Sequence, residues 1–164
     1  MKTAAQIAKH LREVHFGGNW TWSNMKENVA ELSWVEATRK PTPFHSVAEL
    51  VFHTNYFVRV AISALRGEKI DAHDKFSFDL PPIASESDWE NLKNQAFADA
   101  EMLATLIEVL PDERLGATFI LEKYGNHFRN LHGIIEHTHY HLGQIAMVKK
   151  LVSGNENPTS STNP

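Results

Sequence analysis

Apolar residues recur along most of the chain at the three- and four-residue spacing of amphipathic α-helices. Four long helical segments are predicted from this pattern, at residues 3–31, 47–66, 87–110 and 126–152. No segment shows a convincing strand pattern. The predicted fold class is therefore all-α, and two of the segments are long and amphipathic, which favours a four-helix bundle.

Local signals place the ends of these helices. Gly17 and Gly18 are expected to interrupt the first segment, because a Gly-Gly pair between helical patterns is typical of a break. Ser46 and Glu49 form a capping-box pattern at the start of the second segment, and Gly67 is a natural stop. Ser87 and Glu90 repeat the capping-box pattern before the third helix, which Pro111 ends.

The stretch between the second and third helices is unusually long. Residues 69–86 contain "DLPPIAS" and show no sustained apolar period, so they are predicted to form a connection. A connection of this length favours a crossover topology over a simple up-down-up-down order. With 164 residues, the chain is predicted to form a single domain over residues 1–153, followed by a disordered polar tail at 154–164.

Composition excludes several classes of function. There are no cysteines, so disulfides, thiolate zinc sites and a cysteine nucleophile are ruled out. The net charge is −4 and no run of Lys or Arg stands out, which argues against nucleic-acid binding. No stretch approaches the roughly 18 to 20 apolar residues that span a bilayer. A cytoplasmic protein without a membrane partner is predicted.

The segment "EHTHYHLGQI", residues 136–145, holds three histidines at alternate positions. In a helix, His137 and His141 lie one turn apart on the apolar stripe, whereas His139 points almost the opposite way. Neutral imidazoles in this i, i+4 arrangement can bind zinc, nickel or ferrous iron. Thr138 stands where the H-E-x-x-H motif has its glutamate, so the metalloprotease base is missing.

A third ligand is expected from another helix, and His53 is the best candidate. It shares the inward face of the second segment with Leu50, Phe57 and Ala61. The competing interpretation is that all three histidines are buried and hydrogen-bonded without a metal. The other histidines show no spacing that suggests convergence. His127, for example, precedes His137 by about 15 Å along a helix.

Two of these segments carry a family resemblance. "ELVFHTNYF", residues 49–57, and "EHTHYHLGQI", with its H-x-x-x-H followed by x-G-Q, resemble the DinB/YfiT-like superfamily of metal-dependent enzymes. The Gly-Gly break before Trp20 fits as well, and the likeness covers nearly all of residues 1–153. The resemblance implies a four-helix bundle with a crossover between helices 2 and 3, usually a homodimer. It also implies a divalent metal bound by three histidines, here His53, His137 and His141, while Gln144 matches a family glutamine that supports a ligand or packs.

Some members of that superfamily use low-molecular-weight thiols, so a thiol-dependent transferase or a hydrolase acting on a small molecule is predicted. Three protein ligands leave positions on the metal open, as in catalytic zinc sites. Zinc or nickel is the expected ion, and iron is also compatible. Trp20, Trp22 and Tyr56 either line the approach or belong to the core, and no general base is assigned. The alternative is a metal-stabilised or metal-sensing dimer without turnover.

Overall fold

The computed structural model describes residues 2–153, and the polar tail predicted at 154–164 lies outside this range. The described chain contains α-helices and short 3-10 helices, and its one β-type feature is an isolated bridge between Thr118 and Asn126. The prediction of an all-α fold is therefore confirmed. The α-helices are α1 (Thr3–Phe16), α2 (Met25–Val29), α3 (Trp34–Thr38), α4 (Val47–Leu65), α5 (Glu86–Glu108) and α6 (His127–Ser153).

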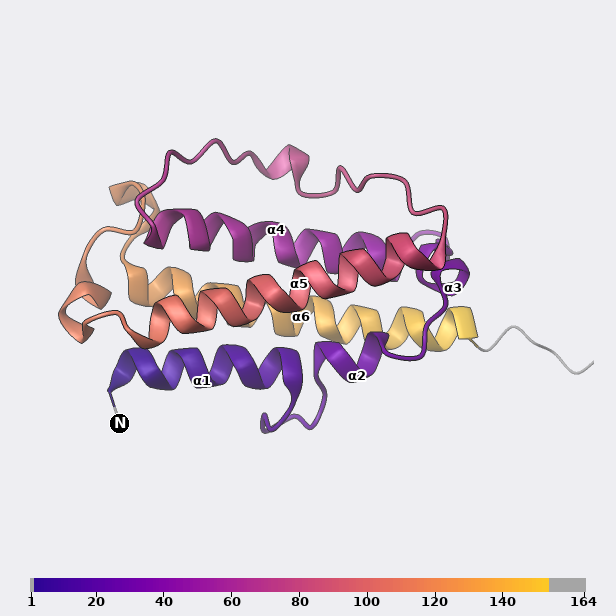
Figure 1. Ribbon diagram of the computed structural model, residues 1–164, viewed down its shortest axis with the longest axis horizontal. Helices are drawn as coiled ribbons and strands as arrows, with labels where there is room; N and C mark the ends of the chain where they lie inside the picture. Colours follow the sequence, from indigo (N-terminus) through magenta and orange to yellow (C-terminus); the bar gives the residue numbers. More distant parts are fainter. Residues whose placement is uncertain (1, 154–164) are drawn as a thin grey trace, which may run out of the picture.

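The long helices α1, α4, α5 and α6 lie side by side (Figure 1). α1 packs against α5 and α6, and α4 packs against the same two helices. α4 and α5 run in the same direction, opposite to α1 and α6 (Figure 1). This direction requires residues 66–85 to travel back along the length of the helices, and they do so over the outer side of α4, with one short 3-10 helix at Asp74–Phe76.

Two clusters of buried apolar side chains hold the helices together. One joins α1, α4, α5 and α6 around Leu11, Leu103 and Leu131. The other lies toward the short helices α2 and α3 and surrounds Trp89, whose side chain is completely buried. Trp89 also donates its indole N–H to the carbonyl oxygen of Leu32, 2.8 Å away. The chain before α4 is thereby tied to α5.

Two of the predicted helix boundaries are confirmed. α1 ends at Phe16, and Gly17 and Gly18 follow with φ angles of 109° and 92°, a backbone region that favours glycine. At the start of α4, the Ser46 hydroxyl oxygen accepts from the Glu49 N–H at 3.2 Å. The Glu49 carboxylate accepts from the Ser46 N–H at 2.8 Å in return, which completes the capping box.

The predicted cap of the third long helix is wrong. α5 begins at Glu86, and its N-cap is Ser85, two residues before the predicted cap Ser87. The Ser85 hydroxyl oxygen accepts from the Asp88 N–H at 3.2 Å and donates to the Asp88 carboxylate at 2.8 Å. The Asp88 carboxylate also accepts from the Ala84 N–H at 3.0 Å, so Asp88 and not a glutamate bonds to the residues at the start of this helix. The short helix α3, capped by Ser33 with Glu36, was not predicted.

Candidate metal centre

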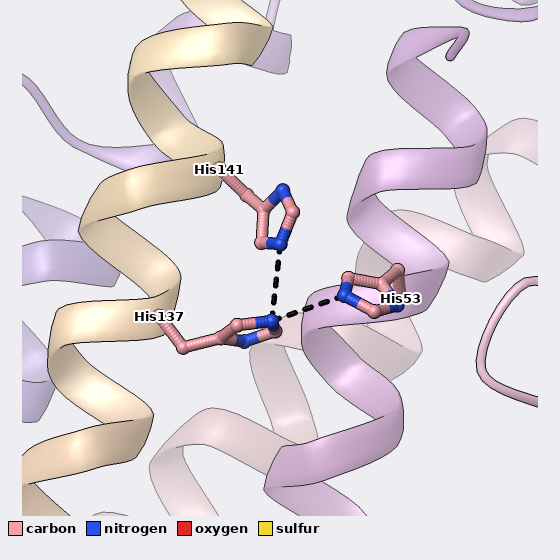
Figure 2. A group of neighbouring side chains, drawn as sticks. All are labelled: His53, His137 and His141. Carbon is pink, nitrogen blue, oxygen red and sulfur yellow. Dashed lines mark hydrogen bonds between the residues drawn. The ribbon is translucent and has the colours of Figure 1, made fainter. Parts of the chain in front are cut away.

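Three histidines from two helices converge in the interior of the fold (Figure 2). His53 projects from α4, and His137 and His141 project from successive turns of α6. The Nε2 atom of His137 lies 3.0 Å from Nε2 of His53 and 3.0 Å from Nε2 of His141. His53 and His141 are 5 % and 8 % exposed, and His137 is half-buried. The nitrogen atoms available as ligands all lie within 4.8 Å of one another.

The orientation of His53 is fixed by the connection between α4 and α5. Its Nδ1 lies 3.0 Å from the hydroxyl oxygen of Ser77, which donates its own proton to the carbonyl oxygen of Asp74 at 2.7 Å. Because the hydroxyl proton is already used, His53 donates from Nδ1 and keeps a lone pair on Nε2. The ring of Phe78 stacks on that of His53, with centroids 4.0 Å apart and an angle of 11° between the planes.

Gln144 orients His141 in the same way. The Nδ1 atom of His141 lies 2.7 Å from Oε1 of Gln144, one turn further along α6. An amide oxygen only accepts hydrogen bonds, so the proton of His141 is on Nδ1 and its Nε2 also carries a lone pair. Both rings therefore direct unprotonated nitrogens at the same point, as hydrogen-bonded metal ligands do.

His137 is the third member of the cluster. Without an ion, hydrogen bonds among the three rings cannot satisfy all of their nitrogen atoms. Its Nδ1 is buried without a hydrogen-bond partner among the described residues. A single proton on its Nε2 satisfies one facing lone pair and leaves the other, whereas one cation satisfies all three nitrogens. Nitrogens that share an ion at about 2.0–2.1 Å lie about 3 to 3.4 Å apart, which agrees with the two 3.0 Å separations. The donor set fits a divalent metal ion.

The electrostatic surroundings keep these imidazoles neutral. Burial, and to a smaller extent the nearby His141, lower the pKa of His53 to about 4. Burial and then the same neighbour likewise lower the pKa of His137 to about 4. The pKa of His141 is also lowered, mainly by burial. Neutral rings at pH 7 have the lone pairs that metal binding needs.

A family comparison covers this site. The model of the DinB superfamily matches residues 19–145, which include all three histidines. The chain belongs to the DinB superfamily. No curated protein and no solved structure matches it.

The remaining histidines of this DinB superfamily protein have other partners. His10 and His139 lie against each other, with ring centroids 5.8 Å apart, and neither joins the cluster. His15 and His127 each use Nδ1 to donate to a backbone carbonyl oxygen, that of Leu11 and Ala117 respectively. Within residues 2–153, the one group of three histidine or carboxylate residues arranged for a metal ion is the predicted one.

The aromatic residues considered for the approach to the metal site differ in exposure and in whether they line a cavity. Trp20 and Trp22 are 94 % and 90 % exposed in the loop after α1, so neither belongs to the core, and neither lines a cavity found beside the histidines. Tyr56 does line such a cavity. Its hydroxyl accepts from the His73 N–H at 2.9 Å and donates to the His73 carbonyl oxygen at 3.0 Å. Tyr56 thus fastens the long connection to α4 in this DinB superfamily protein.

Sequence reasoning missed the contributions of that connection. Ser77, Phe78 and Asp74 all come from the aperiodic stretch that was identified only as a linker. No local pattern marks them, because the residue that they orient, His53, lies 24 positions from Ser77 in the chain. No helix within residues 2–153 combines the length and apolar character needed to cross a membrane.

Proposed function

We propose that this DinB superfamily protein binds a divalent metal ion through Nε2 of His53, His137 and His141 and is a metal-dependent enzyme. The observation that supports this proposal is the shared direction of three imidazole nitrogens, two of them fixed by Ser77 and Gln144. Zinc or nickel is the ion we propose, with ferrous iron also suited to neutral imidazole ligands.

The proposed reaction is a thiol-dependent transfer or a hydrolysis on a small molecule. A metal held by three protein ligands lowers the pKa of a bound thiol or water toward neutrality and polarises a carbonyl group. The residues of the chain would hold the ion, orient its ligands and exclude water. The histidines hold the ion, Ser77 and Gln144 fix their rings, and the rings of Phe57 and Phe78 beside His53 keep water away from one side.

A second candidate is a metal-stabilised or metal-sensing protein without turnover. The burial of His53 and His141 favours it, because structural ions are commonly enclosed. The two candidates differ in how far the fold depends on the ion. A structural ion contributes much of the folding free energy, whereas a catalytic ion leaves a folded protein behind when it is removed.

We also propose the assembly that the superfamily suggests, a four-helix bundle with a crossover between α4 and α5 that forms a homodimer. Support for a dimer comes from an apolar stripe on α6. Tyr140, Met147 and Leu151 are 66 %, 65 % and 49 % exposed, and their spacing of seven and four residues puts them on one face. A cytoplasmic location, the absence of a nucleic-acid partner and a single domain over residues 1–153 stay predictions.

Elemental analysis of the purified protein tests the metal site. We expect about one ion per chain in the native protein and none in His53→Ala or His141→Ala. His132→Ala is the matched control, because this histidine is on α6 but outside the cluster, and it should keep the ion. Metal that persists in both cluster variants would eliminate the proposed ligand set.

An activity assay then separates the two reactions. We expect conjugation of monochlorobimane to a low-molecular-weight bacterial thiol such as bacillithiol or mycothiol, abolished by His141→Ala and retained by His132→Ala. No conjugation across a panel of such thiols would remove the transferase and leave the hydrolase.

A further inference from the structure

An apolar cavity of about 440 Å³ lies beside the histidine cluster. It is bounded by α4, by the connection after α4, by the segment that precedes α6 and by α6 itself. Phe57, Phe119 and Ile134 form part of its wall, and the half-exposed side chains of Leu121 and Tyr124 lie at its solvent side. Cavities of about 300 to 1,000 Å³ with mainly apolar walls are typical of small-molecule sites.

Phe57 connects this cavity to the candidate metal centre. Its ring contacts His137 and His53 edge-on, with centroid separations of 4.9 Å and 5.2 Å. A smaller cavity of about 240 Å³, lined by His137 itself, shares Phe57, Asn130 and Ile134 with the larger one. A molecule in the larger cavity is therefore separated from the cluster by about one aromatic ring.

The polar groups of the wall restrict what the cavity accepts. Among the described residues that line it, Asp74 is the one charged group, and no Lys or Arg is present. A carboxylate without a lining cation disfavours an anionic occupant. The Tyr56 hydroxyl and the Asn130 amide N–H group are already bonded to backbone atoms, so few donors are left for a highly polar molecule.

We propose that this cavity binds small, uncharged and largely apolar groups. We further propose that the group it binds in the functioning protein is the apolar part of the substrate. The binding site stands on the cavity alone. The second statement, that its occupant is a substrate, rests on the proposed function. Apolar walls provide the affinity, and Phe57 with Ile134 directs one end of the bound molecule toward His137.

Fluorescence titration with N-phenyl-1-naphthylamine, a neutral apolar dye, tests the binding site on the full chain. We expect a saturable increase in dye fluorescence. Ala72→Trp narrows the cavity from the connection and should weaken dye binding at least about tenfold, since the added indole takes apolar volume that the dye needs. Ala84→Trp is the matched control, because it adds the same side chain to an exposed position of the same connection, and it should bind like the native protein.

A second variant protects this test against misfolding. Ile120→Trp fills the cavity from the opposite wall, and circular dichroism shows which variants keep their helices. Dye affinity that is unchanged in the folded filling variants, or no saturable binding to the native protein, would overturn the binding site. The anionic dye 1-anilinonaphthalene-8-sulfonate should bind more weakly than the neutral dye and gain a few-fold in affinity in Asp74→Asn. Equal gains for both dyes would refute the selection against anions.

Proton NMR of the neutral dye tests its proximity to the metal centre. We expect its signals to broaden with protein loaded with paramagnetic Co²⁺ and to stay sharp with Zn²⁺-loaded protein. Saturable binding without this broadening would overturn the substrate assignment. Protein stripped with EDTA should still bind the dye. If elemental analysis finds no metal but the dye binds and the filling variants lose it, the proposed function fails while the binding site stands.

Discussion

The hydroxyl oxygen of Ser77 lies 3.0 Å from Nδ1 of His53 and accepts a hydrogen bond from it, although the two residues are 24 positions apart in the chain. Ser77 can only accept, because its own proton goes to the Asp74 carbonyl oxygen. The contact holds His53 in the tautomer and orientation in which Nε2 faces the two histidines of α6. A residue of the long connection thus orients the proposed metal ligand on α4.

Ser77→Ala is expected to weaken zinc binding by about 10- to 100-fold, because metal ligands lose affinity when their hydrogen-bond partner is removed. Competition with a chromophoric chelator measures the change. Ser63→Ala is a matched control, since its hydroxyl lies on α4 but bonds to Glu68. Equal affinities of Ser77→Ala and the native protein would show that this hydrogen bond does not orient the ligand.

Metal removal should lower stability without unfolding the protein. The two apolar clusters contain none of the three histidines, so we expect the helical circular dichroism to survive EDTA at 25 °C. The thermal midpoint should still fall, because free metal at 1,000 times its dissociation constant stabilises the folded state by about 4 kcal/mol. Loss of the helical signal on chelation would favour the structural role of the ion over the catalytic one.

The observed N-cap of α5 predicts different effects on stability for substitutions at Ser85 and Ser87. Ser85→Ala should reduce the free energy of unfolding by about 1 kcal/mol, because the first turn loses the hydroxyl that accepts from Asp88. Ser87→Ala, inside the first turn and exposed, should change it by less than about 0.5 kcal/mol. Urea denaturation compares the two variants, and a larger effect at Ser87 would contradict the observed start of the helix.

His15 should make the protein sensitive to mild acid. Burial lowers the pKa of His15 to about 4, while the unfolded chain takes up a proton near pH 6.5. Between these pH values the unfolded state binds more protons than the folded state. The contribution of neutral His15 to the stability of the folded protein is therefore complete above pH 6.5. It is lost as the pH falls toward 4, by at most about 3 kcal/mol.

His15→Asn retains a donor for the Leu11 carbonyl oxygen but does not titrate, so it should reduce this dependence. The free energy of unfolding of metal-free protein, measured from pH 7 to pH 4, gives the comparison. Parallel curves for the variant and the native protein would exclude His15 as a source of the acid sensitivity.

The apolar stripe on α6 predicts the behaviour of the proposed dimer. Met147→Arg and Leu151→Arg should convert a particle of twice the chain mass into one of 18.6 kDa, because a charge cannot be buried there without a partner. Light scattering after size exclusion measures the mass. Val109→Arg is the control at an exposed position on the end of α5 and should leave the dimer intact.

The sequence by itself determined the features that depend on near neighbours. The apolar spacing indicated helices, Gly17 and Gly18 marked the end of α1, and Ser46 with Glu49 marked the start of α4. The i, i+4 spacing of His137 and His141 put both on one face of α6, because one turn of helix fixes that relation whatever surrounds it. These signals act over three to four residues and can be read from the chain directly.

Only the tertiary structure decided which residues meet across the fold. It placed His53, which the sequence offered as a candidate, 3.0 Å from His137, gave His53 the partner Ser77, and formed the cavity beside Phe57. It also placed the cap of α5 at Ser85, two residues before the predicted Ser87. Contacts of this kind depend on the path of the connection over α4 and on helix packing, which no local pattern of residues specifies.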